Sequence, residues 1–307
     1  MNPPALLARR RRLPAVMFAA TLLGGCANLA AVSEFAADTG KLTGTVRGEL
    51  ARLDDLCTRQ AELVIVVNNL PDDGPLADCR RYQAAEGRLA GVTLDVLDNY
   101  AHALGALTDD KSFDVSPDLK DVAGKLQGLK TRSGAALVDG QEVAALSTLV
   151  DALFDVATSA RRDAAVRRLV DQAPNLATTG KVLRSFFVAA SDAPPGRVRP
   201  PYANLVAVID SSVTSTQALL RSPAMRQAEP IRTAELLRDL DGRRQALAPR
   251  SGSVPAAVAA AIDAWQETLQ KFADEALKPD PRNLRDRLQH LRQMTEAARA
   301  ALGELRH

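Results

Sequence analysis

The sequence predicts an all-α protein, an elongated antiparallel multi-helix bundle that starts with a long helical hairpin. Apolar residues recur in steps of three and four along most of the 307-residue chain, a coiled-coil-like spacing that lines one face of a helix. Prolines stand at or near the start of each apolar segment in the last third of the chain, a position that helices tolerate. The one β-like run is Leu63–Val67, and we expect it to end the first helix.

The first predicted helix runs from residue 32 to residue 67, about 54 Å at 1.5 Å per residue. Its apolar face is formed by Val32, Phe35, Leu42, Val46, Leu50, Leu53, Leu56, Leu63 and Val67. The segment Asn68–Pro75 contains two prolines and a glycine and is a strong break. A second helix is expected from about residue 77 to residue 108, so the two helices form a hairpin.

The middle of the chain predicts shorter helices. Ser116 and Pro117 favour a helix start by capping and by a proline in the first turn. We expect a short helix there, to about Leu129, and then a longer one that carries Val143 to Val166. Pro174 should kink or end that helix, and the helical pattern continues to about Ala190.

The stretch 192–201 is the clearest linker, because it holds four prolines in ten residues. It predicts an N-terminal helical subdomain, 26–191, and a C-terminal one, 202–307, that packs on the first. The second subdomain should contain four helices, at about 202–221, 230–248, 255–277 and 281–306.

The N-terminus carries four arginines, Arg9–Arg12, before a short apolar run that ends at Leu23-Gly24-Gly25-Cys26. A basic region, an apolar region and small residues at a cleavage site make up a secretory signal peptide. The four residues ending in Cys26 resemble the lipobox of bacterial lipoproteins, and the resemblance covers residues 1–27. An ordinary secretory signal followed by an unrelated cysteine is the alternative.

The lipoprotein resemblance implies a location. Residues 1–25 would be removed as a signal peptide, and Cys26 would carry the lipid through its thiol. Ala27 follows the cysteine, where a signal for retention in the inner membrane would place Asp. The resemblance therefore implies a lipid-anchored protein on the periplasmic face of the outer membrane, with acyl chains at about 0.8 kcal/mol per buried methylene holding it there.

The composition excludes some partners. Removal of residues 1–25 takes away four arginines and no acidic residue, so Lys and Arg fall from 39 to 35 against 37 Asp and Glu, a net charge of −2. A mature chain with this charge gives no electrostatic reason to expect nucleic acid. Aromatic residues make up 4% of the chain, with Trp265 the single tryptophan, so a glycan-binding module is disfavoured.

Cys57 and Cys79 are the remaining cysteines, and export permits a disulfide between them. Such a bond closes a 22-residue span and would stabilise the fold by about 3 kcal/mol in the chain-entropy model. It requires residues 68–78 to fold back along the first helix. Two buried free thiols are the alternative.

Two groups of residues could form a partner surface. Glycines fall four apart on one ridge of each helix of the hairpin, and we interpret them chiefly as close internal packing, with a groove for a partner helix as the functional alternative. Two pairs of arginines follow six residues apart and form either a solvated face or a contact for anionic headgroups or an acidic partner. The candidate partner surface comprises Gly40, Gly44, Gly48, Arg161, Arg162, Arg167 and Arg168, and the second glycine ridge is Gly87 and Gly91.

The sequence offers no catalytic or metal-binding set. His102, His290 and His307 are too few and too dispersed, and no HExxH, paired CxxC or nucleophile elbow occurs. We therefore expect no cofactor, no metal and no enzymatic activity.

Three functions stay open at this point. The leading hypothesis is a lipid-anchored helical module that binds another protein of the cell envelope as a scaffold, assembly factor or inhibitor. The second is a carrier that holds a small or lipidic ligand near Phe186, Phe187 and Trp265. The third is an envelope hydrolase built from dispersed carboxylates.

Overall fold

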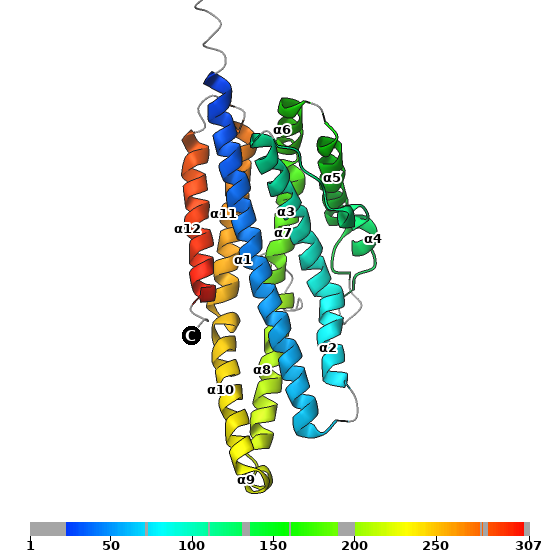
Figure 1. The fold of residues 1–307 in the computed structure, drawn as a ribbon, viewed down its shortest axis with the longest axis vertical. Helices are drawn as coiled ribbons and strands as arrows, with labels where there is room; N and C mark the ends of the chain where they lie inside the picture. Colours follow the sequence, from blue (N-terminus) through cyan, green and yellow to red (C-terminus); the bar gives the residue numbers. More distant parts are fainter. Residues whose placement is uncertain are drawn as a thin grey trace, which may run out of the picture.

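The computed structural model describes residues 23–70, 73–109, 111–130, 136–159, 161–189, 200–276, 278 and 282–303. The secondary-structure elements of these residues are all helices, and the one β-bridge joins Lys130 to Ala136. The protein is therefore an all-α multi-helix bundle, as the sequence predicts, and it is elongated along the direction of its long helices (Figure 1).

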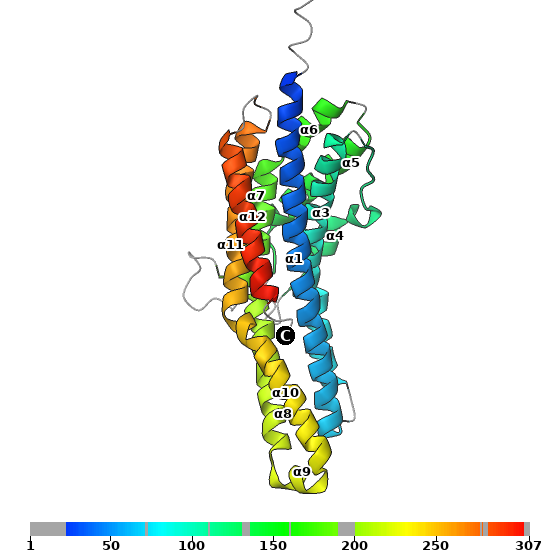
Figure 2. The same cartoon turned by 60° about the vertical axis from the view of Figure 1, so that its left-hand side comes forward.

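Helix α1 (Leu23–Asn68) spans 46 residues, about 69 Å, and runs along most of the molecule. It begins at one end of the long axis and reaches nearly to the other end (Figures 1 and 2). The β-like run Leu63–Val67 forms its last turns, which confirms that expectation.

The chain returns along α1 as a nearly continuous column. It begins at Gly74, three residues before the predicted start, and comprises α2 (Gly74–Tyr82), a π-helical segment (Gln83–Gly87) and α3 (Arg88–Thr108). Both α2 and α3 pack against α1. This antiparallel pair is the predicted long hairpin.

Two further columns are each built from two helices in line. Helices α7 (Ala173–Phe187) and α8 (Pro201–Leu220) run in the same direction as α1, and α10 (Pro230–Ser251) and α11 (Ser253–Glu275) run back. The short helix α9 (Pro223–Ala228) joins the columns at the end far from the start of α1 (Figures 1 and 2). The last helix, α12 (Arg282–Gly303), lies against α1 and α11.

Three of the four columns are interrupted near the same level, which we call the waist. The interruptions are the π-helical segment 83–87, the end of α7 at Phe187 with the start of α8 at Pro201, and Gly252 between α10 and α11. Glu49 of α1 marks this level, because it bonds both Tyr202 at the start of α8 and Arg250 at the end of α10. Helix α1 passes the waist without a break.

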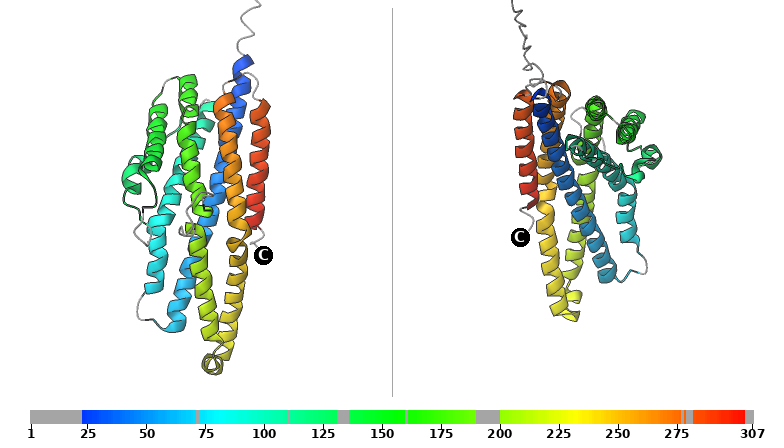
Figure 3. Two further views of the ribbon diagram at one scale, coloured as in Figure 1. Left: turned by 180° about the vertical axis from the view of Figure 1, so that it is seen from behind. Right: turned by 45° about the horizontal axis from the view of Figure 1, so that its top comes forward.

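The waist divides the bundle into two halves. The proximal half comprises residues 29–48 of α1 with α3, α7, α11, α12 and the smaller helices α4 (Val122–Leu126), α5 (Gly140–Ala157) and α6 (Arg162–Val170). The distal half comprises residues 49–70 with α2, α8, α9 and α10. Figure 3 shows the two halves from behind and from above.

Aromatic rings fill the proximal core. Phe35 of α1 stacks on Phe272 with ring centroids 4.3 Å apart, and it also lies 6.3 Å from Trp265. The indole of Trp265 donates to the hydroxyl of Thr39 at 3.0 Å. Asp38, almost fully buried, accepts from Arg292 of α12 at 2.7 Å. These contacts hold α11 and α12 against the first half of α1.

The middle of the chain departs from the prediction. The helix expected to carry Val143 to Val166 is two helices, because the chain turns at Thr158 and Ser159 before α6 begins. The helix expected after Ser116 is a 3₁₀ turn (Pro117–Leu119) followed by α4, and the Ser116 side chain does not cap it. The Asn99 side chain instead accepts from the Ser116 N–H. Pro174 stands in the first turn of α7, so it ends the preceding helix as predicted.

The C-terminal helices match their predicted ranges within a few residues, and α9 is an addition that the sequence did not predict. Most of the proposed linker 192–201 lies outside the described residues. Helices α8, α11 and α12 all contact α1, while the division into two subdomains stays a prediction.

Candidate functional site

The proposed lipid-bearing residue lies at the start of the longest helix. Cys26 falls within the first turns of α1, and its side chain lies outside the described residues, as do residues 1–22 of the proposed signal peptide 1–25. The lipid attachment therefore stays a prediction. If it holds, the lipid is fixed to one end of a helix that runs to the opposite part of the molecule.

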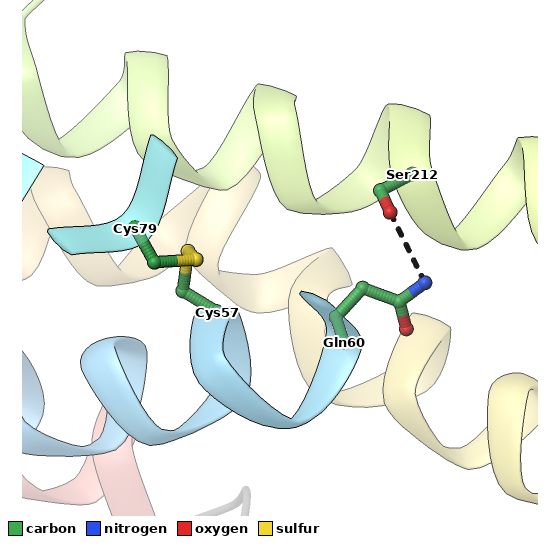
Figure 4. Close-up of a disulfide and its surroundings, with 4 residues drawn as sticks. All are labelled: Cys57, Gln60, Cys79 and Ser212. Atoms are coloured by element: carbon green, nitrogen blue, oxygen red, sulfur yellow. Dashed lines mark hydrogen bonds between the residues drawn. A yellow bond between two sulfur atoms is a disulfide. The ribbon is translucent and has the colours of Figure 1, made fainter. Parts of the chain in front are cut away.

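The cysteine pair that the sequence proposes lies within bonding distance. Cys57 of α1 and Cys79 of α2 form a disulfide with Cα atoms 5.9 Å apart, as Figure 4 shows. The required fold-back occurs, and its second part, from Gly74, is already helical. The Cys57 and Cys79 side chains are both buried.

The three glycines of α1 face outward. Gly40, Gly44 and Gly48 are exposed, and a Cβ added to any of them would meet no atom within 4 Å. The interpretation that they serve close internal packing is therefore wrong. Nine residues at 100° place Cys57 on the side of the helix opposite Gly48, and Cys57 is the residue that the core buries.

A groove lies on one side of the glycines, between α1 and α12. Its volume is about 730 Å³, and all three glycines line it together with Ala300 and Gly303 of α12. Its rim carries more basic than acidic side chains. The charged lining residues are Lys41, Arg52, Glu296 and Arg299.

Of the three basic residues that line this groove, one forms an ion pair with an acidic residue of the described chain. Lys41 pairs with Asp38 at 3.2 Å, whereas Arg52 and Arg299 make no ion pair or hydrogen bond with any part of the chain that the structure describes. A ligand in this groove would therefore meet two arginines that are free to pair with acidic groups.

A second groove, of about 460 Å³, lies between α1 and α3 and meets the glycine ridge at Gly40. Gly40 borders both grooves. Ala36 and Ala37 of α1 and Gly105 and Ala106 of α3 also line it, so its floor is made of small side chains. Asp98 at its edge accepts from Arg47 at 2.5 Å and from the Thr43 hydroxyl.

The four predicted arginines do not form one cluster with the glycines. They lie in or just before α6, near the end of the molecule at which α1 begins (Figure 1). Arg162 donates to the Thr108 carbonyl of α3, and Arg168 pairs with Asp155 of α5 at 3.2 Å. Arg161 and Arg167 are exposed. Two of the four therefore stabilise the fold internally.

A buried polar group that the sequence did not predict lies at the waist. Glu49 is completely buried, and its carboxylate accepts from Arg250 at 2.7 and 3.0 Å and from the Tyr202 hydroxyl at 2.7 Å. Burial raises the pKa of the Tyr202 hydroxyl, and the Glu49 carboxylate raises it further. The available signal was a charged residue beside Val46 and Leu50 on the apolar face of the first helix.

A second polar group lies near the waist, where α2 passes into the π-helical segment. The Tyr82 hydroxyl is buried without a hydrogen-bond partner among the described residues. Burial raises its pKa, and the carboxylates of Asp54 and Glu86 raise it further. Burial also raises the pKa of both carboxyl groups.

The aromatic residues proposed to line a ligand cavity are instead packed together. Phe186 and Phe187 have centroids 5.5 Å apart, and Phe187 lies 5.1 Å from Tyr202. A Cβ on Gly180 would lie 2.8 Å from the Trp265 ring. The two grooves described above and a third one between α11 and α12 are lined by none of these rings.

Comparisons of the chain with protein-family models, with curated proteins and with solved structures find no match. No group of His, Cys, Asp and Glu suited to a metal ion occurs among the residues that the structure describes. Within the same residues, no helix is both long and apolar enough to cross a membrane.

Proposed function

We propose that this protein is a lipid-anchored helical binding module of the cell envelope, and that the outward face of α1 around Gly44 receives a helix of another envelope protein. Its lipid on Cys26 would hold it at the periplasmic face of the outer membrane. The module acts by binding and positioning rather than by catalysis.

The exposed glycines carry this proposal. A glycine within a helix is less favourable than alanine by roughly 1 kcal/mol. Three of them in the middle of the longest helix, with open space beyond each, have no packing function in the described structure. A bound helix would explain why glycines stand at these three positions, because a surface without side chains lets another backbone approach closely.

The two grooves suit such a helix. The groove beside α12 follows all three glycines, and the groove beside α3 meets the ridge at Gly40, so a helix on the glycine ridge could place side chains in both. Arg52 and Arg299 would favour acidic groups on the α12 side. A partner helix with small residues on its contact face and acids along one flank fits this surface.

The test is a photo-crosslink in cells followed by a blocking substitution. A photoreactive residue at Lys41, which borders the α12 groove, should capture one defined envelope protein. Gly44→Leu should abolish that product, because the side chain projects into the space the helix would occupy. The Gly44→Leu variant should fold normally, since a Cβ there meets no atom within 4 Å.

Gly242→Leu is the matched control. Gly242 is also an exposed helical glycine with open space around it, but it lies in α10 of the distal half. The crosslink should persist in this variant. A product that survives Gly44→Leu, or that disappears equally in both variants, would contradict the proposal.

A further inference from the structure

Helix α8 presents an outer face without charge. Its exposed residues are all uncharged, namely Asn204, Val208, Ser211, Thr214, Ser215, Ala218 and Leu219. Every other described helix of fifteen or more residues exposes at least one Lys, Arg, Asp or Glu. The exposed face of a helix in a soluble protein normally carries charged residues, so this face of α8 is exceptional in the molecule.

The exposed residues of α8 also include two large apolar side chains. Val208 is 52% exposed and Leu219 36% exposed. Both lie on the same side, because eleven residues make almost three turns of helix. Helix α8 is already packed against α1 and α10 on its other sides.

Five residues of this face repeat with the spacing of a helix-to-helix seam. Asn204, Val208, Ser211, Ser215 and Ala218 follow one another in steps of four, three, four and three. This is the spacing of the a and d positions of paired helices, with polar residues at three of the five positions. Leu219 flanks the last of them. The face therefore has the periodicity that a second helix needs, although no helix of this chain covers it in the part described.

We propose that α8 pairs with α8 of a second copy of this chain, in parallel and about a two-fold axis along the helices. In such a pair every residue at the seam faces its own counterpart, so any charge there would face a like charge. The five seam positions of α8 carry no charge, so no like charges meet in such a pair. Contact with a different protein would not require the seam to be uncharged.

The parallel orientation brings both large apolar residues to their own counterparts, which no single antiparallel register does. It sets Val208 against Val208 of the second copy and brings the two Leu219 side chains to the same end. An antiparallel pair centred on Ser211 would set Val208 against Ser215. The face is one helix wide, about 10 Å, and about 30 Å long, so it covers about 300 Å². This is less than the roughly 800 Å² that each partner buries in stable complexes. The pair is therefore weak and reversible.

The experiment uses two differently tagged full-length copies expressed in the same cell. A photoreactive residue at Ser211 should join the two tags in one product. The same residue at Ser185, an exposed serine of α7 in the proximal half, should not.

Charge substitutions at Ser215 then test the parallel symmetry. Ser215→Glu in both copies, or Ser215→Lys in both, should reduce the Ser211 crosslink about tenfold through like-charge repulsion. One copy with Ser215→Glu and the other with Ser215→Lys should restore it. Ser215 is exposed, and unchanged thermal melting of each variant confirms that the fold is intact.

Three results would overturn the proposal. They are the absence of a product between the two tags, a product from Ser211 that joins only a different protein, and a charge mixture that fails to restore the crosslink. None of these involves the α1 grooves, so failure here is separate from failure of the proposed partner surface.

Discussion

Phe35 in the proximal half and Gln60 in the distal half lie on the same helix, yet they hold their neighbours by different means. Phe35 stacks on aromatic rings of α11. Gln60, almost fully buried, donates to Ser212 of α8 at 3.2 Å (Figure 4). It also donates to Thr216 of α8 at 3.3 Å and accepts from Arg243 of α10 at 3.2 Å. In the proximal half, aromatic stacking on Phe35 adds to polar contacts such as that of Asp38 with Arg292. In the distal half, the buried Gln60 amide links three helices through hydrogen bonds.

The exposed surfaces of the two halves also differ. All large apolar side chains that are strongly exposed among the described residues belong to the distal half, namely Val66, Leu70, Val208, Leu219 and Ile231. Both halves bury polar side chains, and the distal half differs in exposing large apolar ones. Since apolar burial is the main source of stability, this half should be the less stable one, and its surface is better suited to contacts with other molecules.

The largest effect is expected where the two halves meet. Arg250→Ala leaves the Glu49 carboxylate buried without its partner, and breaking a buried ion pair in this way costs about 3–5 kcal/mol. Urea unfolding measures the loss. The double variant Glu49→Gln and Arg250→Met removes both charges and should recover much of it. A loss below about 1 kcal/mol in Arg250→Ala would show that the pair does not hold the waist.

A matched pair of leucines compares the two cores directly. Leu269 of α11 and Leu247 of α10 are each 1% exposed and lie in the same column. Leucine-to-alanine changes in cores cost about 2–5 kcal/mol. We expect Leu269→Ala near the upper limit and Leu247→Ala near the lower one, because polar neighbours and water can reach the distal site more easily. If urea unfolding showed equal losses of unfolding free energy in the two variants, the two cores would not differ in this way.

Two Gly→Ala substitutions compare an exposed helical position, Gly44, with a packed one, Gly180. Gly44→Ala should raise the free energy of unfolding by roughly 0.5–1 kcal/mol, as alanine favours a helix, and there is open space for its Cβ. Gly180→Ala should lower it, because the new Cβ would lie 2.8 Å from the Trp265 ring. Thermal melting of both variants provides the comparison. Destabilisation by Gly44→Ala would mean that the α1 face is packed.

The smallest effect depends on pH. Burial raises the pKa of the Asp54 carboxyl, so its contribution to stability is present below its ordinary pKa and is lost as the pH rises through the raised value. Asp54→Asn should therefore raise the melting temperature at pH 7 and have less effect near pH 3. Asp55→Asn is the control, since Asp55 is exposed and pairs with Arg59 at 2.9 Å. A larger gain at pH 3 than at pH 7 would contradict this explanation.

The apolar periodicity predicted the long helices well, because each of them buries a continuous stripe against its neighbours. Smaller elements such as α9 were missed, since a six-residue helix has too few turns to show a period. The turn between α5 and α6 was missed because apolar spacing continues across it from Val156 to Val166.

The candidate site was predicted only in part. The spacing of Gly40, Gly44 and Gly48 identified them as one ridge, but spacing alone does not tell whether a neighbour covers that ridge. The grooves depend on where α3 and α12 pack, over distances in sequence that no local pattern reports. The contact of Glu49 with Arg250 joins residues 201 positions apart, so it too required the fold.

Amide hydrogen exchange in native conditions tests the central difference between the halves most directly. Amides of Ala261–Leu269 in α11 should exchange only through global unfolding, and those of Leu240–Leu247 in α10 through openings of lower free energy. Reduction of the disulfide between Cys57 and Cys79 should accelerate exchange in α2 and α10 and leave α11 unchanged. Equal protection of α10 and α11, with or without the disulfide, would contradict the account.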